Sequence, residues 1–179
     1  MSFAYVANFA SSTISVIDTK VHSVIATVIL NSSPAFINFA PDSKLAYVLS
    51  TPLSLTNKTV SVIDVKTHTL LSTVPVGLSF NLLLFNSSVV AISPNGKYAY
   101  ITNLIEGTVS VIDVKTHSTI STIKVGLAPN SLAISPDGKS VYVTNVGEDK
   151  VSVIDTKTQV VITTITVGNN PVFVAFSPT

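Results

Sequence analysis

Short apolar runs follow one another along the whole chain, and polar turn residues separate them. Each run is rich in Val, Ile, Thr or Tyr, and no stretch shows the spacing of an amphipathic helix. The last quarter illustrates the pattern with the runs SVYVTN (140–145), VSVID (151–155), VVITTITV (160–167) and PVFVAFS (171–177). The pattern predicts an all-β protein built from many short strands.

The runs belong to a repeated unit. Four copies of one phrase, STISVIDTKVH, KTVSVIDVKTH, GTVSVIDVKTH and DKVSVIDTKTQ, begin at residues 12, 58, 107 and 149. A tyrosine phrase precedes each copy and a VAISP-like phrase follows it, with tyrosines at 5, 47, 100 and 142 and prolines at 41, 94, 136 and 178. Three units share a period of 42 residues, whereas the second carries 11 additional residues.

A unit of four short strands with a period near 42 is typical of a β-propeller blade. We therefore expect one propeller domain over residues 1–179 with four four-stranded blades. The repeats span about 1–44, 45–97, 98–139 and 140–179. Within a blade we expect the VAISP run innermost, then the tyrosine, SVID and TTITV runs, with tight turns at SPDG and after SVID.

The two ends of the chain are in phase with the repeat. Counting from Pro178 through Thr179 to Tyr5 gives six residues, the spacing between every internal proline and the next tyrosine. The first blade would lack an innermost strand, which the C-terminal run would supply. Two closures satisfy this spacing: a four-bladed ring from one chain, or an eight-bladed ring from a homodimer that exchanges strands at the shared blades.

The phrases VYVTN, SVIDTKT, TITVGNNP and ISPDGK resemble the YVTN-type β-propeller repeats of bacterial and archaeal surface-layer and periplasmic proteins. The resemblance covers almost the whole chain and implies a location at the cell surface or in the periplasm. Members commonly have seven blades, whereas this sequence has four units. The chain also departs from the pattern at Ser50, which replaces the asparagine, and at the insertions of the second unit. Its N-terminus has no signal-peptide pattern as written.

Composition argues against several classes of partner. The net charge is +1, the chain has no arginine, and its lysines are spaced along the repeats, so no nucleic-acid contact is expected. Cysteine is absent, which excludes disulfides and thiolate metal sites. The most apolar stretch, residues 70–92, is interrupted by serines and asparagines, and we therefore interpret it as strands with an insertion and expect no membrane span.

The acidic and histidine residues obey the repeat. Asp18, Asp64, Asp113 and Asp155 occupy one hairpin position, and His22, His68 and His117 each follow that aspartate by four residues. Such positions are spread round a ring, too far apart to share one metal ion. No nucleophile elbow or phosphate loop is present. We expect turn chemistry at these positions, with no catalytic residue, bound metal or cofactor.

The second unit carries the strongest departure from the repeat. Its insertion GLSFNLLLFNSS holds an apolar cluster made of Phe80, Leu82, Leu83, Leu84 and Phe85. An exposed cluster of this kind marks a contact surface, and the alternative is a lid that buries itself against its own blade. Two inserted regions also contain N-x-[ST] sequons, at Asn57 and Asn86, and a third sequon begins at Asn31.

Three functional hypotheses follow from the sequence. The first is a non-enzymatic propeller scaffold or binding module of surface-protein type, with a protein or a surface glycan as its partner. The second is a small-molecule-binding or hydrolytic propeller, similar to the lactonases, that acts at the channel mouth. The third is a structural unit that assembles with itself. A cluster of carboxylates at one channel mouth would favour the second hypothesis.

Overall fold

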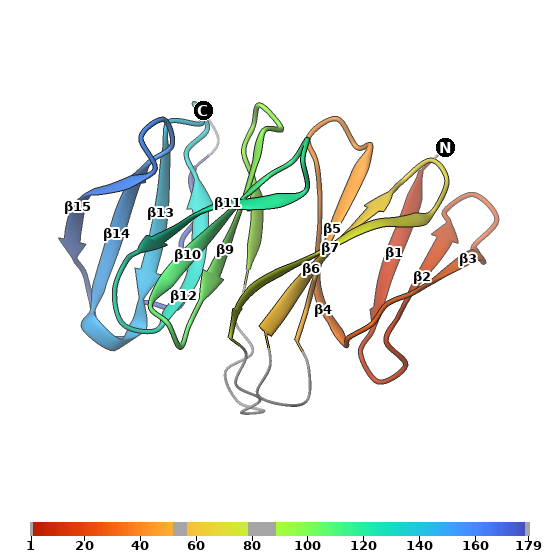
Figure 1. Ribbon diagram of the computed structural model, residues 1–179, viewed down its shortest axis with the longest axis horizontal. Helices are drawn as coiled ribbons and strands as arrows, with labels where there is room; N and C mark the ends of the chain where they lie inside the picture. The colour runs from red at the N-terminus through yellow and green to blue at the C-terminus, as the bar shows by residue number, and fades with distance from the viewer. Residues whose placement is uncertain (1, 52–56, 79–88, 178–179) are drawn as a thin grey trace.

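The computed structural model describes residues 2–51, 57–78 and 89–177. Within them the chain forms four antiparallel sheets side by side in chain order, which we call blades 1 to 4 (Figure 1). Blade 1 has three strands and each of the others has four. The all-β propeller architecture with four blades per chain is therefore confirmed.

The strands follow the predicted runs. Blade 1 consists of β1 (Phe3–Asn8), β2 (Thr13–Asp18) and β3 (Ser23–Ile29), and blade 2 of β4 (Pro34–Phe39), β5 (Leu45–Ser50), β6 (Asn57–Asp64) and β7 (Thr69–Leu78). Blade 3 consists of β8 (Val90–Ile92), β9 (Tyr98–Asn103), β10 (Thr108–Asp113) and β11 (Ser118–Lys124). Blade 4 consists of β12 (Pro129–Ile134), β13 (Ser140–Asn145), a 3-10 turn η1 (Val146–Glu148), β14 (Lys150–Asp155) and β15 (Val160–Thr166). The strand order in each sheet is the expected one.

Local sequence sets the hairpins between the SVID strand and the outermost strand. In blade 3, Oδ1 of Asp113 accepts hydrogen bonds from the backbone N–H groups of Lys115 (2.9 Å) and Thr116 (2.8 Å), and His117 closes the turn at φ 52°. A bulge interrupts the ladder at the Val-Ile pair of every SVID phrase, for example at Val111 and Ile112. Because a bulge increases the twist of a strand, all four blades twist at the same place.

The hydrophobic core lies between blades rather than inside one of them. One cluster joins blades 1 and 2, a second joins blades 2 and 3, and a third joins blades 3 and 4. In the second cluster, Leu49 and Val60 of blade 2 lie with Val90 and Ile101 of blade 3, and all four are fully buried. Each blade therefore depends on its neighbours for burial, as in other repeat proteins.

The four blades form an open arc, and the described residues leave blade 1 without an inner strand. Among the described residues, β1 pairs only with β2, so its inner edge carries no partner strand. Residues 171–177 form no strand and lie beside β12 of blade 4, far from the N-terminus (Figure 1). The closed four-bladed ring is therefore not the arrangement of this structure, because the two ends of the chain lie on different blades.

Candidate functional site

An asparagine at the end of the tyrosine strand ties this strand to the next one. In blade 3, Nδ2 of Asn103 donates to Oγ1 of Thr108 (3.0 Å) and to Oγ of Ser110 (2.8 Å). The same group of Asn145 donates to Ser152 (2.8 Å) in blade 4. Asn103 and Asn145 are fully buried, so these bonds replace those that their Nδ2 groups would make with water, whereas their Oδ1 atoms accept no hydrogen bond from the described residues. This geometry explains the asparagine of the YVTN phrase.

A glycine of the preceding blade packs directly on this asparagine. A Cβ atom on Gly126 would lie 2.6 Å from Nδ2 of Asn145, and one on Gly77 would lie 2.5 Å from Cγ of Asn103 and overlap the side chain of Glu106. Real Cβ atoms do not approach other atoms so closely. Glycine is therefore required wherever one blade meets the asparagine of the next.

At the junction of blades 1 and 2 the asparagine stands at the other of these two positions. Here Asn31 stands at the glycine position and Ser50 at the asparagine position. Thr59, the equivalent of Thr108, bonds through its hydroxyl to Ser32 Oγ of blade 1 at 3.0 Å. The larger side chain stands in the bend that follows β3, where it is exposed, and the smaller one stands on the tyrosine strand. Sequence reasoning recorded Ser50 as a departure from the repeat and missed its partner, which the shared spacing could have shown.

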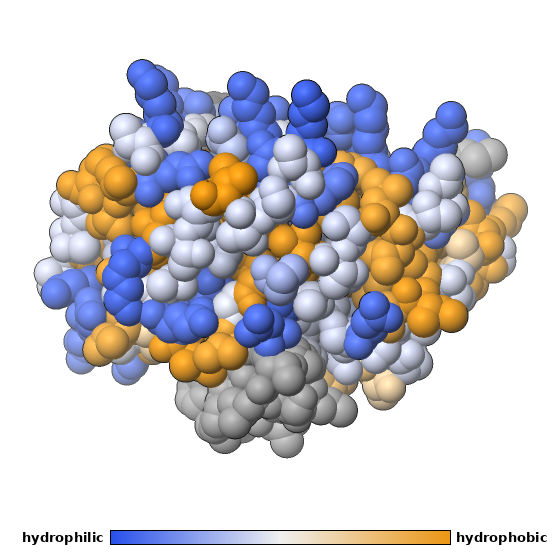
Figure 2. Space-filling model, in the orientation of Figure 1, coloured by the Kyte–Doolittle hydropathy of each residue, from blue (hydrophilic) through white to orange (hydrophobic). Residues whose placement is uncertain are grey.

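The two ends of the arc expose faces that are buried everywhere else. Ile165 on β15 is 42% exposed, whereas its equivalents Val28, Val74 and Ile123 are 5%, 4% and 6% exposed. A Cβ atom on Gly168, the blade 4 equivalent of Gly126, would meet nothing within 4 Å. Figure 2 shows apolar side chains towards both ends of the molecule and hydrophilic ones along its upper edge. Blade 4 therefore exposes the surface that in blades 1 to 3 contacts the next blade.

Blade 1 presents the complementary surface. Val6 on β1 is 43% exposed, while its equivalents Val48, Ile101 and Val143 are fully buried. The exposed end faces of blades 1 and 4 are the two halves of one repeated contact. We call them the open blade faces.

Residues 171–177 lie where the innermost strand of a further blade would lie. The ring of Phe176 meets Tyr142 of blade 4 edge-on at 5.1 Å, as Phe39 of blade 2 meets Tyr5 of blade 1 at 5.2 Å. In addition, Nδ2 of Asn130 donates to the carbonyl of Val172 at 2.7 Å. The segment is thus held by its own blade 4 and offers its other side to solvent.

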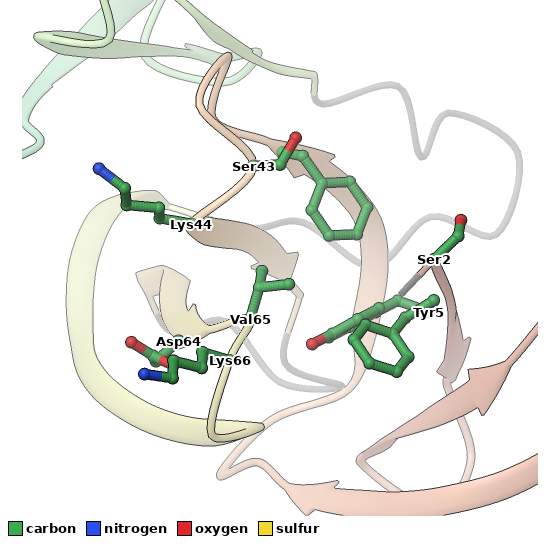
Figure 3. A pocket seen from close by; sticks show the side chains of 9 residues that line it. Ser2, Tyr5, Ser43, Lys44, Asp64, Val65 and Lys66 are labelled. Carbon is green, nitrogen blue, oxygen red and sulfur yellow. The ribbon is translucent and has the colours of Figure 1, made fainter.

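A cavity of about 610 Å³ lies between blades 1 and 2 (Figure 3). Phe3 and Tyr5 line its blade 1 side, and Phe39, Lys44 and Asp64 are among the residues that line its blade 2 side. The equivalent space between blades 2 and 3 measures about 400 Å³, and there blade 2 contributes the end of its inner strand and the turn that follows it. Blade 1 has no inner strand of its own, which accounts for the wider space.

Two aromatic residues that line this larger cavity, Phe3 and Tyr5, contact the imidazole ring of His68 behind them. The hydroxyl of Tyr5 is hydrogen-bonded to Nδ1 of His68 at 2.8 Å, and Phe3 meets the His68 ring edge-on at 4.8 Å. Burial and, to a smaller extent, the nearby Asp64 carboxylate raise the pKa of Tyr5. The phenol is therefore neutral and can donate this bond.

The aspartates and histidines of the repeat lie in hairpin turns. Hydrogen bonds from backbone N–H groups are the main cause that lowers the pKa of Asp64, Asp113 and Asp155. His22, His68 and His117 occupy the left-handed position of the same turns, where the fourth copy has Gln159. Within the described part of the chain, no three His, Cys, Asp or Glu residues gather as a metal site would require.

Lys58 is a buried residue that sequence reasoning missed. It stands at the start of β6, where other units have Ser12, Gly107 or Asp149, and its side chain enters the contact between blades 2 and 3. Its Nζ donates to the carbonyl of Thr102 at 2.7 Å, and burial lowers the pKa of its amino group to about 8. The only signal in the sequence was a long charged residue in a slot of small or acidic ones.

The candidate contact residues Phe80, Leu82, Leu83, Leu84 and Phe85 lie outside the described residues, so their role stays a prediction. In the described ranges there is no helix long and apolar enough to cross a membrane.

Solved structures with the same fold are larger than this chain. Kuenenia stuttgartiensis hydrazine synthase matches with a TM-score of 0.76 and 24% identity, over 91% of this chain and 45% of that one. A functionally unknown protein from Desulfotomaculum acetoxidans DSM 771 matches with a TM-score of 0.81 and 20% identity, over 98% and 56% of the two chains. The dihydro-heme d1 dehydrogenase NirN in complex with DHE matches with a TM-score of 0.69 and 15% identity, over 92% and 35%.

The chain thus spans about half the length of the first two structures. At these identities the likeness concerns the fold alone. No match was found among curated proteins. The family model of the YNCE-like beta-propeller matches residues 82–179, which is more than half of the chain. The blade order, the repeated contacts between blades and this match lead to one conclusion: the chain belongs to the YNCE-like β-propeller family.

Proposed function

We propose that this chain is a non-enzymatic β-propeller scaffold of surface-protein type, and that two copies complete one eight-bladed ring. The observation that carries the proposal is the exposure of the open blade faces. Ile165 and Val6 are each more than 40% exposed, although their equivalents inside the arc are almost fully buried. A scaffold made of repeats gains stability when every such face is covered.

The chemistry of the described side chains supports a scaffold. The SVID aspartates stabilise turns, and Glu148 accepts a hydrogen bond from the backbone of Leu127 (3.2 Å), so that it fastens blade 4 to the end of blade 3. These carboxylates therefore have structural roles, in turns and in contacts between blades. The resemblance to surface-layer repeats supports the surface-protein part of the proposal.

We propose two copies because a closed ring leaves no open blade face. The open faces of blades 1 and 4 are different surfaces, so the contact is head-to-tail and closes only when the rotation adds up to a full turn. Eight blades need about 45° between neighbours, and known propellers have roughly 4 to 8 blades. Two arcs of four blades then close with both pairs of faces covered.

Light scattering on the 179-residue chain tests the proposal directly. We expect a mass of about twice 18.8 kDa. Substitution Gly168→Val should shift this mass to that of a single chain, because nothing lies near Gly168 within one arc while Asn8 of a second copy would approach it in the ring. A wild-type mass near 18.8 kDa would overturn the two-copy ring.

A further inference from the structure

The structure assigns a docking site for a peptide strand to the inner edge of β1, and we propose that its occupant is residues 171–177 of a second copy. This inference rests on the proposed two-copy ring and adds the strand, its register and the cavity that it narrows. Three features of the molecule support it: the free edge of β1, the segment 171–177 and the cavity beside β1.

The inner edge of β1 lacks the partner that every equivalent strand has. Strands β5, β9 and β13 each pair on that side with the inner strand of their blade, whereas β1 pairs in the described part of the chain only with β2. Free edges are usually protected by charged residues or proline. Residues 2–8 contain neither, so this edge is open to pairing with another strand.

The segment 171–177 is already held in the position of an inner strand. Its own blade 4 fixes it through Asn130 and Tyr142, as described above. The segment has no charged residue, and Val172 and Phe173 are 61% and 74% exposed. Phe36, the blade 2 equivalent of Phe173, has its partner strand and is 36% exposed, so pairing with a strand would cover part of Phe173.

The register follows from the three complete blades. Inner and tyrosine strands pair as Ile37 with Val48, Val90 with Ile101, and Leu132 with Val143. The equivalent pair between two copies is Val174 with Val6, followed by Ala175 with Tyr5 and Phe176 with Ala4. In this register Val6 gains the cover that its equivalents have within the arc.

The missing inner strand of blade 1 also explains why the cavity between blades 1 and 2 is the larger one. Ala40, at the end of the inner strand of blade 2, helps to line the smaller space between blades 2 and 3, and its equivalent in the repeat is Ser177. When residues 171–177 of a second copy lie along β1, Ser177 reaches the blade 1 wall of the cavity of about 610 Å³. We therefore expect this cavity to narrow in the ring towards the size of the space between blades 2 and 3, about 400 Å³.

A second copy is the occupant because the same chain cannot place its segment there in this structure. The segment is anchored on blade 4, at the opposite end of the arc from β1 (Figure 1). In the two-copy ring, the segment of each copy stays on its own blade 4 and meets β1 of the other copy. In both contacts residues 171–177 gain the strand pairing that they lack in this structure.

Disulfide mapping tests the register, since the natural chain has no cysteine. Ser135 donates its backbone N–H to Ser140 O at 2.8 Å, so Leu132 and Val143, three positions further, form a non-hydrogen-bonded pair with close side chains. The pair Val6 and Val174 is of the same kind. Chains with Val6→Cys and chains with Val174→Cys are mixed and oxidised, and a disulfide between them can form only between copies.

We expect a heterodimer from this mixture on a non-reducing gel, in about tenfold greater yield than from Val6→Cys mixed with Val172→Cys, whose side chains would be displaced by two residues. Circular dichroism checks that the variants fold, and Ala4→Cys with Phe176→Cys is the alternative pair. Equal yields from matched and displaced pairs, in a chain that light scattering shows to be a dimer, would overturn strand docking and leave the ring. A single-chain mass would overturn both. An internal disulfide at single-chain mass in the double variant Val6→Cys/Val174→Cys would assign the site to the chain's own segment and overturn the second copy.

Discussion

The buried junction between blades 3 and 4 and the open face of blade 4 are built from the same repeated residues. Gly126 lies against Asn145 in the junction, and Ile123 is buried there. Gly168 and Ile165 have the same positions in their blade, yet nothing lies near the first and the second is largely exposed. The difference shows that the neighbouring blade, and not the residue itself, decides whether a position of the repeat belongs to the core.

The largest expected effect separates these two glycines. Gly126→Val should lower the free energy of unfolding by about 3 kcal/mol, because its side chain would overlap Asn145 in a well-packed contact. Gly168→Val should leave the stability of the single arc unchanged and alter only the assembly. Urea unfolding at low protein concentration measures both. Equal losses for the two variants would show that the open face is not equivalent to the junction.

The second largest effect is expected from replacing the asparagine at the end of the tyrosine strand. Asn103→Ala should cost about 2 kcal/mol, because the hydroxyls of Thr108 and Ser110 lose their donor in a buried site. Asn8 makes the equivalent bonds to Thr13 and Ser15 in blade 1 but is only half-buried. Asn8→Ala should therefore cost about half as much in the single arc. Urea or thermal unfolding of the two variants measures both losses of unfolding free energy. A larger loss for Asn8→Ala than for Asn103→Ala would contradict the assignment of blade 1 as an open end.

The exchanged pair of blades 1 and 2 can be tested with a double-mutant cycle. Ser50→Asn should cost about 1.5 kcal/mol, because Ser50 is fully buried and Asn31 occupies the position that is glycine elsewhere. Adding Asn31→Gly recreates the combination of the other junctions and should recover most of the loss, which gives a coupling free energy of about 1 kcal/mol. Strictly additive effects would show that the two positions do not share one contact.

The smallest effect concerns Lys58, which distinguishes the junction of blades 2 and 3 from that of blades 3 and 4. Its pKa is about 8 in the folded chain and 10.5 ordinarily, so between these values the unfolded chain holds one more proton. Stability should therefore rise with pH in this window, by about 1 kcal/mol per pH unit at most. Unfolding measured at pH 8 and 9.5 should show the rise in the wild type and not in Lys58→Met. The window ends near pH 10, where the raised pKa of Tyr100, about 12 because of burial, begins to act in the opposite direction.

The sequence by itself determined the strands, their order and the turns. These features depend on residues close together in the chain: the apolar runs, the Asp113 type of hairpin with its backbone hydrogen bonds, and the period of 42 residues. All of this is local or periodic information, which a single sequence carries in full.

Only the tertiary structure decided where the core ends. The burial of Lys58, the glycine contacts and the different exposures of Ile123 and Ile165 depend on which blade lies against which, and equivalent residues of a repeat look alike in the sequence. The structure likewise showed that the segment 171–177 stays on blade 4, because Asn130 and Tyr142 hold it there. Whether a residue is buried depends on the blade that packs against its own blade. The sequence of a single repeat unit does not carry this information.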